Sequence, residues 1–223
     1  IPPGTPPRPA GSAPENIDFS PGQMLATWQF YVLWFMYACG AGAGLMIISK
    51  MAKIASAQAG IELGFILVAV LAVGNGAGRI VTGIASDKIG RKATLLICFA
   101  LQTILILLLS QTAEGSLLAN AVVLAVVAAL IGANYGANLA LFPSLTKDYY
   151  GLKNFGVNYG LLYTSWGVGG FMLALLAGKV YDETGSFNFA YYCSAVLLTL
   201  AAAVTFLVKP PCRLEEVPAA SPQ

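Results

Sequence analysis

Six long apolar runs constrain this chain more than any other feature of its sequence. They cover residues 24–49, 61–85, 93–111, 117–142, 155–180 and 187–208. Each is close to or longer than the roughly 20 residues that a helix needs to cross the hydrocarbon core of a bilayer. A membrane β-barrel would show alternating segments of about ten residues instead. We therefore predict an all-α membrane protein with six transmembrane helices, surrounded by the lipid bilayer.

Composition supports this class and excludes several others. Only 10% of the residues are charged, whereas a soluble domain carries about 25%. The net charge of +2 excludes a strongly basic nucleic-acid-binding protein. The chain has no histidine, and its four cysteines form no CxxC pair. Because nucleophile–base pairs and metal-binding patterns are also missing from the sequence, we expect neither an enzyme nor a cofactor or metal site.

The two ends differ in composition from the apolar middle. The chain opens with Ile1 and a proline-rich stretch that lacks the apolar core of a signal peptide. Such a stretch is typical of an extended linker. We therefore predict a linker over residues 1–22, a helical bundle over 23–209 and a tail over 210–223. A chain that begins inside a linker is expected to belong to a longer protein, unless its start is a processed one.

The loops between the runs are asymmetric in charge. With the proline-rich segment on side one, that side carries Arg8, Lys88, Arg91, Lys92, Lys147, Lys153, Lys209 and Arg213, whereas side two carries Lys50, Lys53 and Lys179. Basic residues concentrate in cytoplasmic loops. We therefore expect a multi-pass protein of the cell membrane (inner or plasma membrane) with both ends of this segment in the cytoplasm.

The six runs also divide into two groups of three. The first and fourth runs both carry glycine or asparagine near their middle. Secondary transporters are often built from three-helix units that are repeated with inverted topology. We therefore expect a 3+3 inverted repeat.

Arg79 is the one ionisable residue that falls deep inside an apolar run. A charge there costs about 2.5–3.5 kcal/mol on insertion scales, so it is expected to face a partner or a water-filled cavity. A guanidinium binds a carboxylate through two parallel hydrogen bonds, which predicts a site for an anionic substrate. Alternatively, the side chain extends to the headgroups.

Other polar and aromatic residues follow helical spacing near the middle of the runs. Asn75 precedes Arg79 by one turn and is expected on the same face, although an asparagine also forms hydrogen bonds between membrane helices. Four helices that each present one polar or aromatic face are expected to line a central cavity. The other candidates for contact with the substrate are Asn134, Asn138, Tyr37, Tyr163 and Trp166. Each aromatic stripe taken alone is more often a packing feature than a ligand contact.

A specific motif lies between the second and third runs. In GIASDKIGRKATL, five residues follow the spacing G-x-x-x-D-x-x-G-R-K; they are Gly83, Asp87, Gly90, Arg91 and Lys92. The aspartate is expected to pair with a neighbouring cation, and the glycine permits a tight turn. This spacing resembles the signature loop of the major facilitator superfamily, where it follows the second helix of each six-helix half.

The resemblance extends over most of the chain. The motif follows the second of six predicted helices, so the chain resembles the C-terminal half, helices seven to twelve, of a major facilitator. WQFYVLWFMYACGAGAGLMIIS, NGAGRIVTGIASDKIGR, ALFPSLTKDYYG and NYGLLYTSWGVGG also resemble the oxalate/formate antiporter family, which is related to the monocarboxylate transporters. This resemblance implies secondary transport by alternating access, a conformational role for the motif loop, and an N-terminal six-helix half as partner.

The family also implies a role for Arg79, because an arginine on helix eight binds the substrate carboxylate there. Two positions depart from the relatives. Asn75 stands where monocarboxylate transporters have an acidic residue, and Trp166 stands where oxalate transporters have a lysine. A single cation suits a monocarboxylate such as lactate, pyruvate or formate better than the dianion oxalate.

Two alternatives remain at the level of sequence. An absent half could supply a second cation, which would suit oxalate/formate exchange. A sensor or scaffold could also keep the fold without transporting anything. A co-transported proton would need a carrier outside this segment or on the substrate, because the six runs contain no buried carboxylate or histidine.

Overall fold

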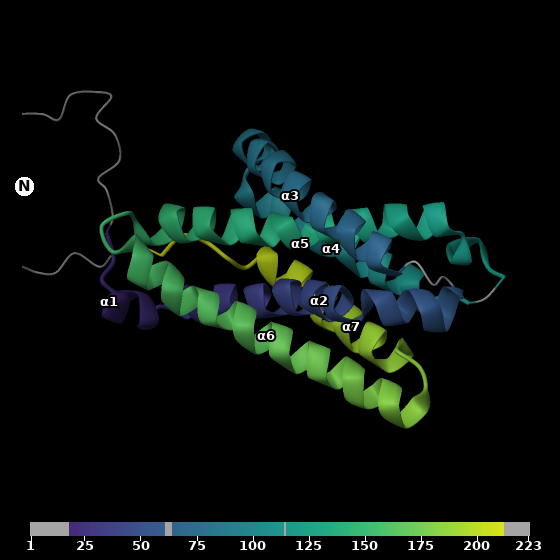
Figure 1. The fold of residues 1–223 in the computed structure, drawn as a ribbon. Coiled ribbons are helices and arrows are strands. Elements are labelled where there is room, and N and C mark those ends of the chain that lie inside the picture. Colours follow the sequence, from purple (N-terminus) through teal and green to yellow (C-terminus); the bar gives the residue numbers. More distant parts are fainter. Residues whose placement is uncertain (1–17, 61–63, 114, 212–223) are drawn as a thin grey trace, which may run out of the picture.

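Six long helices and one short one make up most of the protein in the computed structural model, which describes residues 18–60, 64–113 and 115–211 (Figure 1). In chain order they are α1 (Pro21–Leu25), α2 (Trp28–Ala59), α3 (Gly64–Ile89), α4 (Arg91–Ser110), the 3-10 turn η1 (Leu117–Ala119), α5 (Ala121–Tyr150), α6 (Phe155–Thr184) and α7 (Asn188–Thr205). Within these ranges there is no strand, and α2 to α7 are each long and apolar enough to cross a membrane. The predicted all-α membrane fold is therefore confirmed. Most of the predicted linker (1–17) and tail (212–223) lies outside the described residues.

The helices extend beyond several of the predicted apolar runs. The first run was expected to end at residue 49, but α2 continues to Ala59 and stops at Gly60, whose φ of 67° is left-handed. Similarly, α5 continues through Pro143 to Tyr150 rather than ending at residue 142. Hydropathy marks the part of a helix that lies in lipid, whereas the helix itself ends where the backbone meets a terminating residue such as glycine.

The helix contacts show the predicted internal repeat. The most extensive pairs are α3 with α5, α2 with α6, and α4 with α7. Exchanging α2 with α5, α3 with α6 and α4 with α7 maps this set of pairs onto itself. Because α2 and α5 run in opposite directions (Figure 1), the two triplets are related by inversion. This confirms the 3+3 inverted repeat.

Glycines allow the closest of these helix crossings. Gly74 and Gly78 of α3 lie against the backbone of Ala129 and Ala133 in α5, so that added Cβ atoms would clash with that backbone. The two helices run parallel and cross obliquely (Figure 1). On the other side of the bundle, Gly169 of α6 lies in the same way against the backbone of Ala38 in α2. Small residues let membrane helices approach this closely.

The segment before α1 is fixed to the loop between α5 and α6. Asp18 Oδ1 accepts hydrogen bonds from the amides of Leu152 and Lys153, at 2.9 Å each. The carbonyl of Phe19 accepts from Asn154 and Asn158 Nδ2, at 3.0 Å each. The Phe19 ring is buried in edge contact with Tyr150. The last residues of the predicted linker therefore belong to the packed bundle.

Candidate functional site

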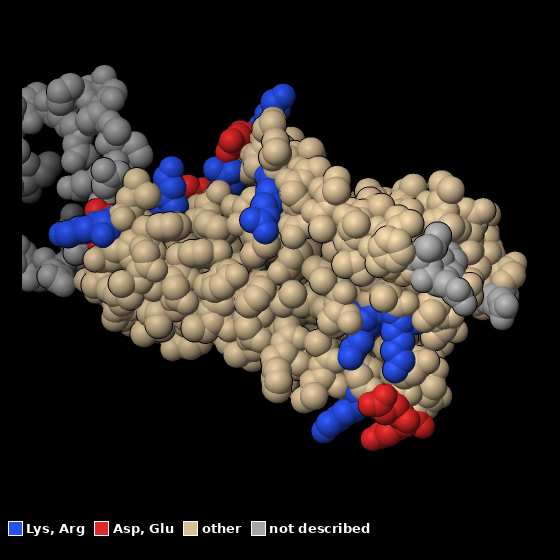
Figure 2. All heavy atoms as spheres, viewed as in Figure 1, with Lys and Arg blue, Asp and Glu red and all other residues tan. Residues whose placement is uncertain are grey.

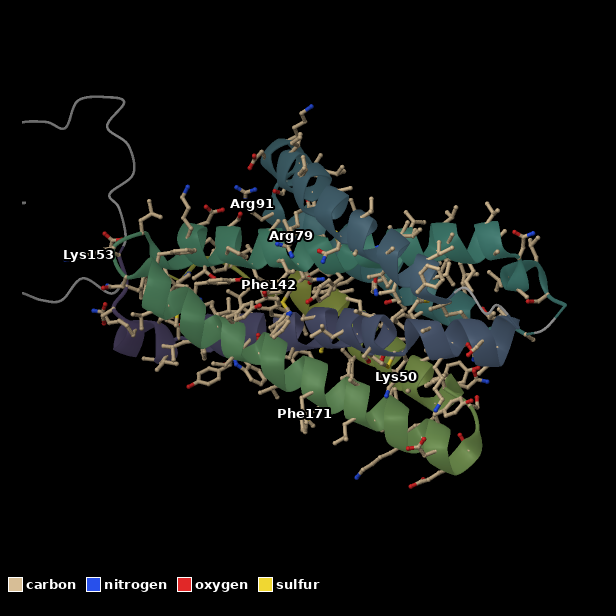
Figure 3. All side chains as sticks on the ribbon, viewed as in Figure 1. Lys50, Arg79, Arg91, Phe142, Lys153 and Phe171 are labelled. Atoms are coloured by element: carbon tan, nitrogen blue, oxygen red, sulfur yellow. The ribbon has the colours of Figure 1, made fainter. Side chains whose placement is uncertain are left out.

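The candidate site lies on the side of the bundle that faces the viewer, about halfway along its length. Figure 2 shows cationic side chains at the two ends of the bundle and one isolated blue side chain between them. Figure 3, drawn from the same side, labels Arg79 at this position, with Arg91 and Lys153 toward one end and Lys50 toward the other. Arg79 is exposed on α3. In this six-helix unit the site is therefore an open face rather than an enclosed cavity.

Arg79 is oriented by the residue one turn before it. Its Nε donates a hydrogen bond to Asn75 Oδ1 at 3.3 Å, which leaves both terminal nitrogens of the guanidinium available. Gly136 of α5 lies against the carbonyl and the side-chain oxygen of Asn75. A larger residue at 136 would press on the amide that holds Arg79. The crossing of α3 and α5 thus fixes the direction of the guanidinium.

A continuous set of aromatic rings lies beside Arg79. Tyr159, Tyr163 and Trp166 follow one face of α6; Tyr163 stacks on Trp166 with 5.2 Å between ring centroids, and Tyr159 lies 5.6 Å from Tyr163. Tyr37 of α2 shares a hydrogen bond of 3.2 Å with the Tyr159 hydroxyl. The Tyr37 ring is buried and stacks on Phe142 of α5 at 4.2 Å. Helical spacing places Tyr163 and Trp166 on one face of α6, and the packing of α2 against α6 brings the Tyr37 ring to 6.0 Å from Tyr163.

Two aromatic residues of this set were missed by the sequence-based selection. Tyr135 of α5 accepts a hydrogen bond of 2.9 Å from Trp166 Nε1, and Tyr159 bonds to Tyr37. Tyr135 directly precedes Gly136, the residue that lies against Asn75. Tyr159 follows the same helical spacing as Tyr163 and Trp166, so the sequence does indicate it, although it was not selected for substrate contact. Tyr135 could not be found in this way, because its role depends on the packing of α5 against α6.

Asn134 and Asn138 lie elsewhere. Their side chains are only 5% and 3% exposed, and both amides donate to carbonyls of their own helix, those of Leu130 and Asn134. Asn134 lines a mostly apolar space between α3, α4 and α5, and the Asn138 side chain lies against Gly40 of α2. The spacing of four residues did put them on one face of α5, but that face points to the interior and not to Arg79.

The motif loop forms an ion-pair cluster at one end of the bundle. Arg91 pairs with Asp87, with 2.6 Å between Nη1 and Oδ1, and with Asp148 at the end of α5, with 3.3 Å between Nε and Oδ2. Its guanidinium also donates to the Ser86 hydroxyl. Gly90 adopts a φ of 90° between α3 and α4, a value that favours glycine. The cluster therefore joins the α3–α4 turn to α5.

The chemistry available at the Arg79 face is anion binding. In the described part of the chain, neither ion pair involves Arg79, and the only acidic partners are those of Arg91. A planar guanidinium with two free terminal nitrogens fits a carboxylate through two parallel hydrogen bonds. The neighbouring rings supply apolar surface for the small remainder of such a ligand. Across residues 18–60, 64–113 and 115–211, no group of three or more potential metal-ligating side chains is found.

Comparison with known proteins finds one matching family model and two curated relatives. The sequence model of the Major Facilitator Superfamily matches residues 19–222. An oxalate:formate antiporter of Oxalobacter formigenes is 29% identical over 200 residues, covering 86% of this chain and 45% of the relative. The uncharacterized MFS-type transporter YhjX of Escherichia coli strain K12 is 28% identical over 154 residues, covering 68% of this chain and 37% of the relative. The chain thus spans less than half the length of these curated relatives.

Proposed function

The chain belongs to the Major Facilitator Superfamily, and we propose that it forms the C-terminal six-helix half of a secondary transporter for a small monocarboxylate such as lactate, pyruvate or formate. The observation that carries this proposal is Arg79, which lies midway along the bundle without a carboxylate partner among the described residues. A charge kept at this depth is costly. A substrate that neutralises it recovers part of that cost when it binds.

The residue on α6 supports a monoanion over a dianion. Trp166 occupies the place at which the sequence resemblance implies a lysine in oxalate transporters. Its indole donates to Tyr135 and stacks on Tyr163, so the position is filled by an aromatic ring that is fixed at both ends. Apart from Arg79, the described lysines and arginines lie toward the ends of the helices or in the loops. One cation beside an aromatic wall suits one carboxylate with a small apolar group.

A second candidate is exchange of oxalate for formate. The oxalate:formate antiporter of Oxalobacter formigenes is the observation that favours it. Oxalate would need a second cation, which an N-terminal half facing Arg79 could provide. A non-transporting sensor or scaffold with the same fold is the third candidate, and it would bind the anion without moving it.

In the proposed mechanism, this half and an N-terminal six-helix half rock about a central site. The carboxylate binds Arg79 with Asn75 holding the guanidinium in place, and the rings of α6 pack against the rest of the substrate. The ion pairs of Arg91 with Asp87 and Asp148 join the ends of α3, α4 and α5 within this half, so the motif loop helps the half to move as one unit. A co-transported proton would travel on the substrate or on the other half.

The charge distribution supports an orientation in the cell membrane. Among the described residues, Lys88, Arg91, Lys92, Lys147, Lys153 and Lys209 lie at one end, and Lys50, Lys53 and Lys179 lie at the other. We place the first set, with both ends of the segment, in the cytoplasm, following the preference of basic residues for that side.

The test is uptake of labelled lactate, pyruvate, formate and oxalate into proteoliposomes that contain the full-length transporter. We expect uptake of at least one monocarboxylate to fall at least 100-fold in Arg79→Ala and at least tenfold in Arg79→Lys, because a lysine cannot form the two parallel bonds. Lys153→Ala removes a cation from the α5–α6 loop and should leave uptake unchanged. Unchanged uptake in Arg79→Ala would end the proposal, and binding without uptake would support the sensor.

A further variant distinguishes a substrate with one carboxylate from a substrate with two. Trp166→Lys places a second cation near Arg79, so we expect it to raise oxalate uptake relative to lactate uptake. If the unaltered protein already prefers oxalate to every monocarboxylate, exchange of oxalate for formate becomes the better assignment.

A further inference from the structure

A pocket lies between α3, α4 and α5, where α3 crosses α5 (Figure 1). Its volume is about 300 Å³, at the lower end of the range of about 300–1,000 Å³ that is typical of small-molecule sites. Arg79 does not line it, and the described residues that do line it carry no charge. Val81 and Ile97 belong to the lining and are exposed on the surface of the bundle. An apolar rim of this kind on two membrane-spanning helices opens the pocket toward lipid.

The pocket contains a hydrogen-bond acceptor that has no donor. Asn134 lines it and is only 5% exposed. The amide nitrogen of Asn134 donates to the carbonyl of Leu130 at 3.1 Å, but its Oδ1 accepts no hydrogen bond from the described residues. This oxygen is not one of the unpartnered polar atoms that the protein encloses completely, so it faces open space, and the pocket is the space that Asn134 lines. A buried acceptor without a donor costs free energy, which a ligand that donates a hydrogen bond recovers.

Thr82 supplies a second polar group without a partner. Its side chain projects from α3, lines the same pocket and is 8% exposed. The hydroxyl forms no hydrogen bond with the described part of the chain, and it is not completely enclosed either. A threonine hydroxyl can both donate and accept. Asn134 and Thr82 therefore offer an acceptor and a donor, from two different helices, to one molecule in the pocket.

The threonines nearby have partners, which makes the state of Thr82 informative. Thr94 lines the same pocket, but its hydroxyl donates to a carbonyl of the preceding turn at 2.9 Å. A groove of about 340 Å³ between α4 and α7 is lined by Thr103 and Thr199, whose hydroxyls each donate to a carbonyl of their own helix at 2.8 Å. Threonine inside a helix commonly uses its proton in this way. Thr82 departs from this pattern, and it does so in the pocket that also holds the unpartnered amide oxygen.

We propose that this pocket binds a small neutral amphiphile that enters from the bilayer and carries one hydroxyl group, such as an alkyl alcohol. The hydroxyl donates to Asn134 Oδ1 and accepts from Thr82, and the alkyl part packs against apolar lining such as Leu101. An ion does not fit, because the lining offers no opposite charge in an apolar environment. A pure hydrocarbon fits the walls but leaves both polar groups without partners. The proposal does not depend on what the Arg79 face transports.

The experiment measures the binding of octanol to the purified full-length protein in lipid nanodiscs. An octanol that carries a photoreactive diazirine is activated by light, and mass spectrometry locates the labelled residues. We expect labelling of the α3 and α4 residues that line the pocket. Unlabelled octanol should compete about tenfold more effectively than octane at equal concentration in the membrane, because octane can form neither of the two hydrogen bonds.

Three variants and a matched control test the residues of the pocket. Thr82→Val keeps the shape of the side chain and Asn134→Leu keeps most of its volume; each should weaken octanol binding about fivefold through the loss of one hydrogen bond. Ala85 also lines the pocket, so Ala85→Leu should fill it and abolish the labelling. The control is Thr103→Val, which removes a threonine hydroxyl of α4 outside the pocket. We expect it to bind octanol like the unaltered protein.

Thermal unfolding separates lost binding from lost folding. Thr82→Val removes a hydroxyl that has no partner among the described residues, so it should not lower the unfolding temperature in the absence of octanol. The proposal is overturned if octane competes as well as octanol, or if Thr82→Val and Asn134→Leu both bind as well as the unaltered protein. A loss of binding in Thr103→Val as large as theirs, or labelling spread evenly over the lipid-facing helices, would overturn it as well.

Discussion

Two helix crossings in this protein are built alike and differ in chemistry. In the crossing of α3 with α5, Gly78 lies against the backbone of Ala133; in the crossing of α2 with α6, Gly169 lies against the backbone of Ala38. The inverted repeat relates the two. Yet the first crossing presents Arg79 and Asn75, whereas the second presents the rings of Tyr37 and its neighbours on α6.

The difference shows how a repeated scaffold acquires one asymmetric site. Glycines at a crossing fix the distance and angle between two backbones, and residues next to the contact are held by the same rigid pair of helices. Arg79 directly follows Gly78, and Trp166 lies one turn before Gly169 and Gly170. The repeat therefore supplies precise positions, and the side chains at those positions decide whether they bind charge or apolar surface.

The largest effect on stability should come from a substitution that fills the close contact between α3 and α5. Gly78→Ala places a methyl group against the backbone of Ala133, which cannot move unless the helices separate. We expect a loss of about 3 kcal/mol in the free energy of unfolding, at the upper end for overpacking. Gly76→Ala on the same helix meets nothing within 4 Å and should change stability by less than about 1 kcal/mol. Thermal unfolding of the full-length protein in detergent measures both, and similar losses would contradict the packing argument.

A second substitution tests whether the α2–α6 crossing is packed as tightly as the α3–α5 crossing. Gly169→Ala would meet the backbone of Ala38 as closely as Gly78→Ala meets that of Ala133, so we expect a loss of about 2–3 kcal/mol. Gly167→Ala has open space around it and serves as the control. A loss at Gly169 no greater than that at Gly167 would show that α2 and α6 can separate freely and that only the charged crossing is rigid.

The sequence predicted the fold well because hydropathy and helix length are strong signals in a bilayer. It also predicted that Asn75 and Arg79 share a helix face, since residues four apart do so whatever the tertiary structure, and the structure adds the hydrogen bond between them. It misplaced Asn134 and Asn138, because a shared face does not reveal which neighbour that face meets. Here it meets α2 and α4.

The contacts of Tyr135 and Phe19 could not be predicted from the sequence either. Tyr135 joins the candidate site through a hydrogen bond from a residue 31 positions away. Phe19 docks on residues about 130 positions away, at Tyr150, Asn154 and Asn158. Local composition identified Phe19 only as the end of a proline-rich stretch. Long-range partners such as these depend on the packing of whole helices.

A third prediction concerns how the charged crossing holds its guanidinium. Gly136→Ala presses on the carbonyl and the side-chain oxygen of Asn75, whereas Gly132→Ala presses only on the backbone of Leu71. We expect both to lower stability by similar amounts, but only Gly136→Ala to raise the KM for the transported carboxylate, by about tenfold or ~1.4 kcal/mol. Uptake per folded protein gives the comparison. An equal rise in KM for Gly132→Ala would mean that helix packing in general, and not Asn75, sets the direction of Arg79.

The smallest effect is expected at the aromatic crossing. Trp166→Phe keeps a ring on Tyr163 but removes the hydrogen bond to Tyr135, so we expect the KM to rise about fivefold, the equivalent of one bond of ~1 kcal/mol. Trp34 offers a matched control, because its indole donates a bond of the same length, 2.9 Å, to Thr164 and so also joins α6 to a neighbouring helix.

The control separates two explanations for such an effect. Trp34 belongs to α2, and its indole bonds to Thr164, whereas the indole of Trp166 bonds to Tyr135. If hydrogen bonds from α6 matter only because they tie helices together, Trp34→Phe should raise the KM as much as Trp166→Phe does. If Trp166 instead matters because it fixes the Tyr135 hydroxyl, only Trp166→Phe should raise the KM. The aromatic crossing would then contribute to binding through one fixed hydroxyl as well as through apolar surface.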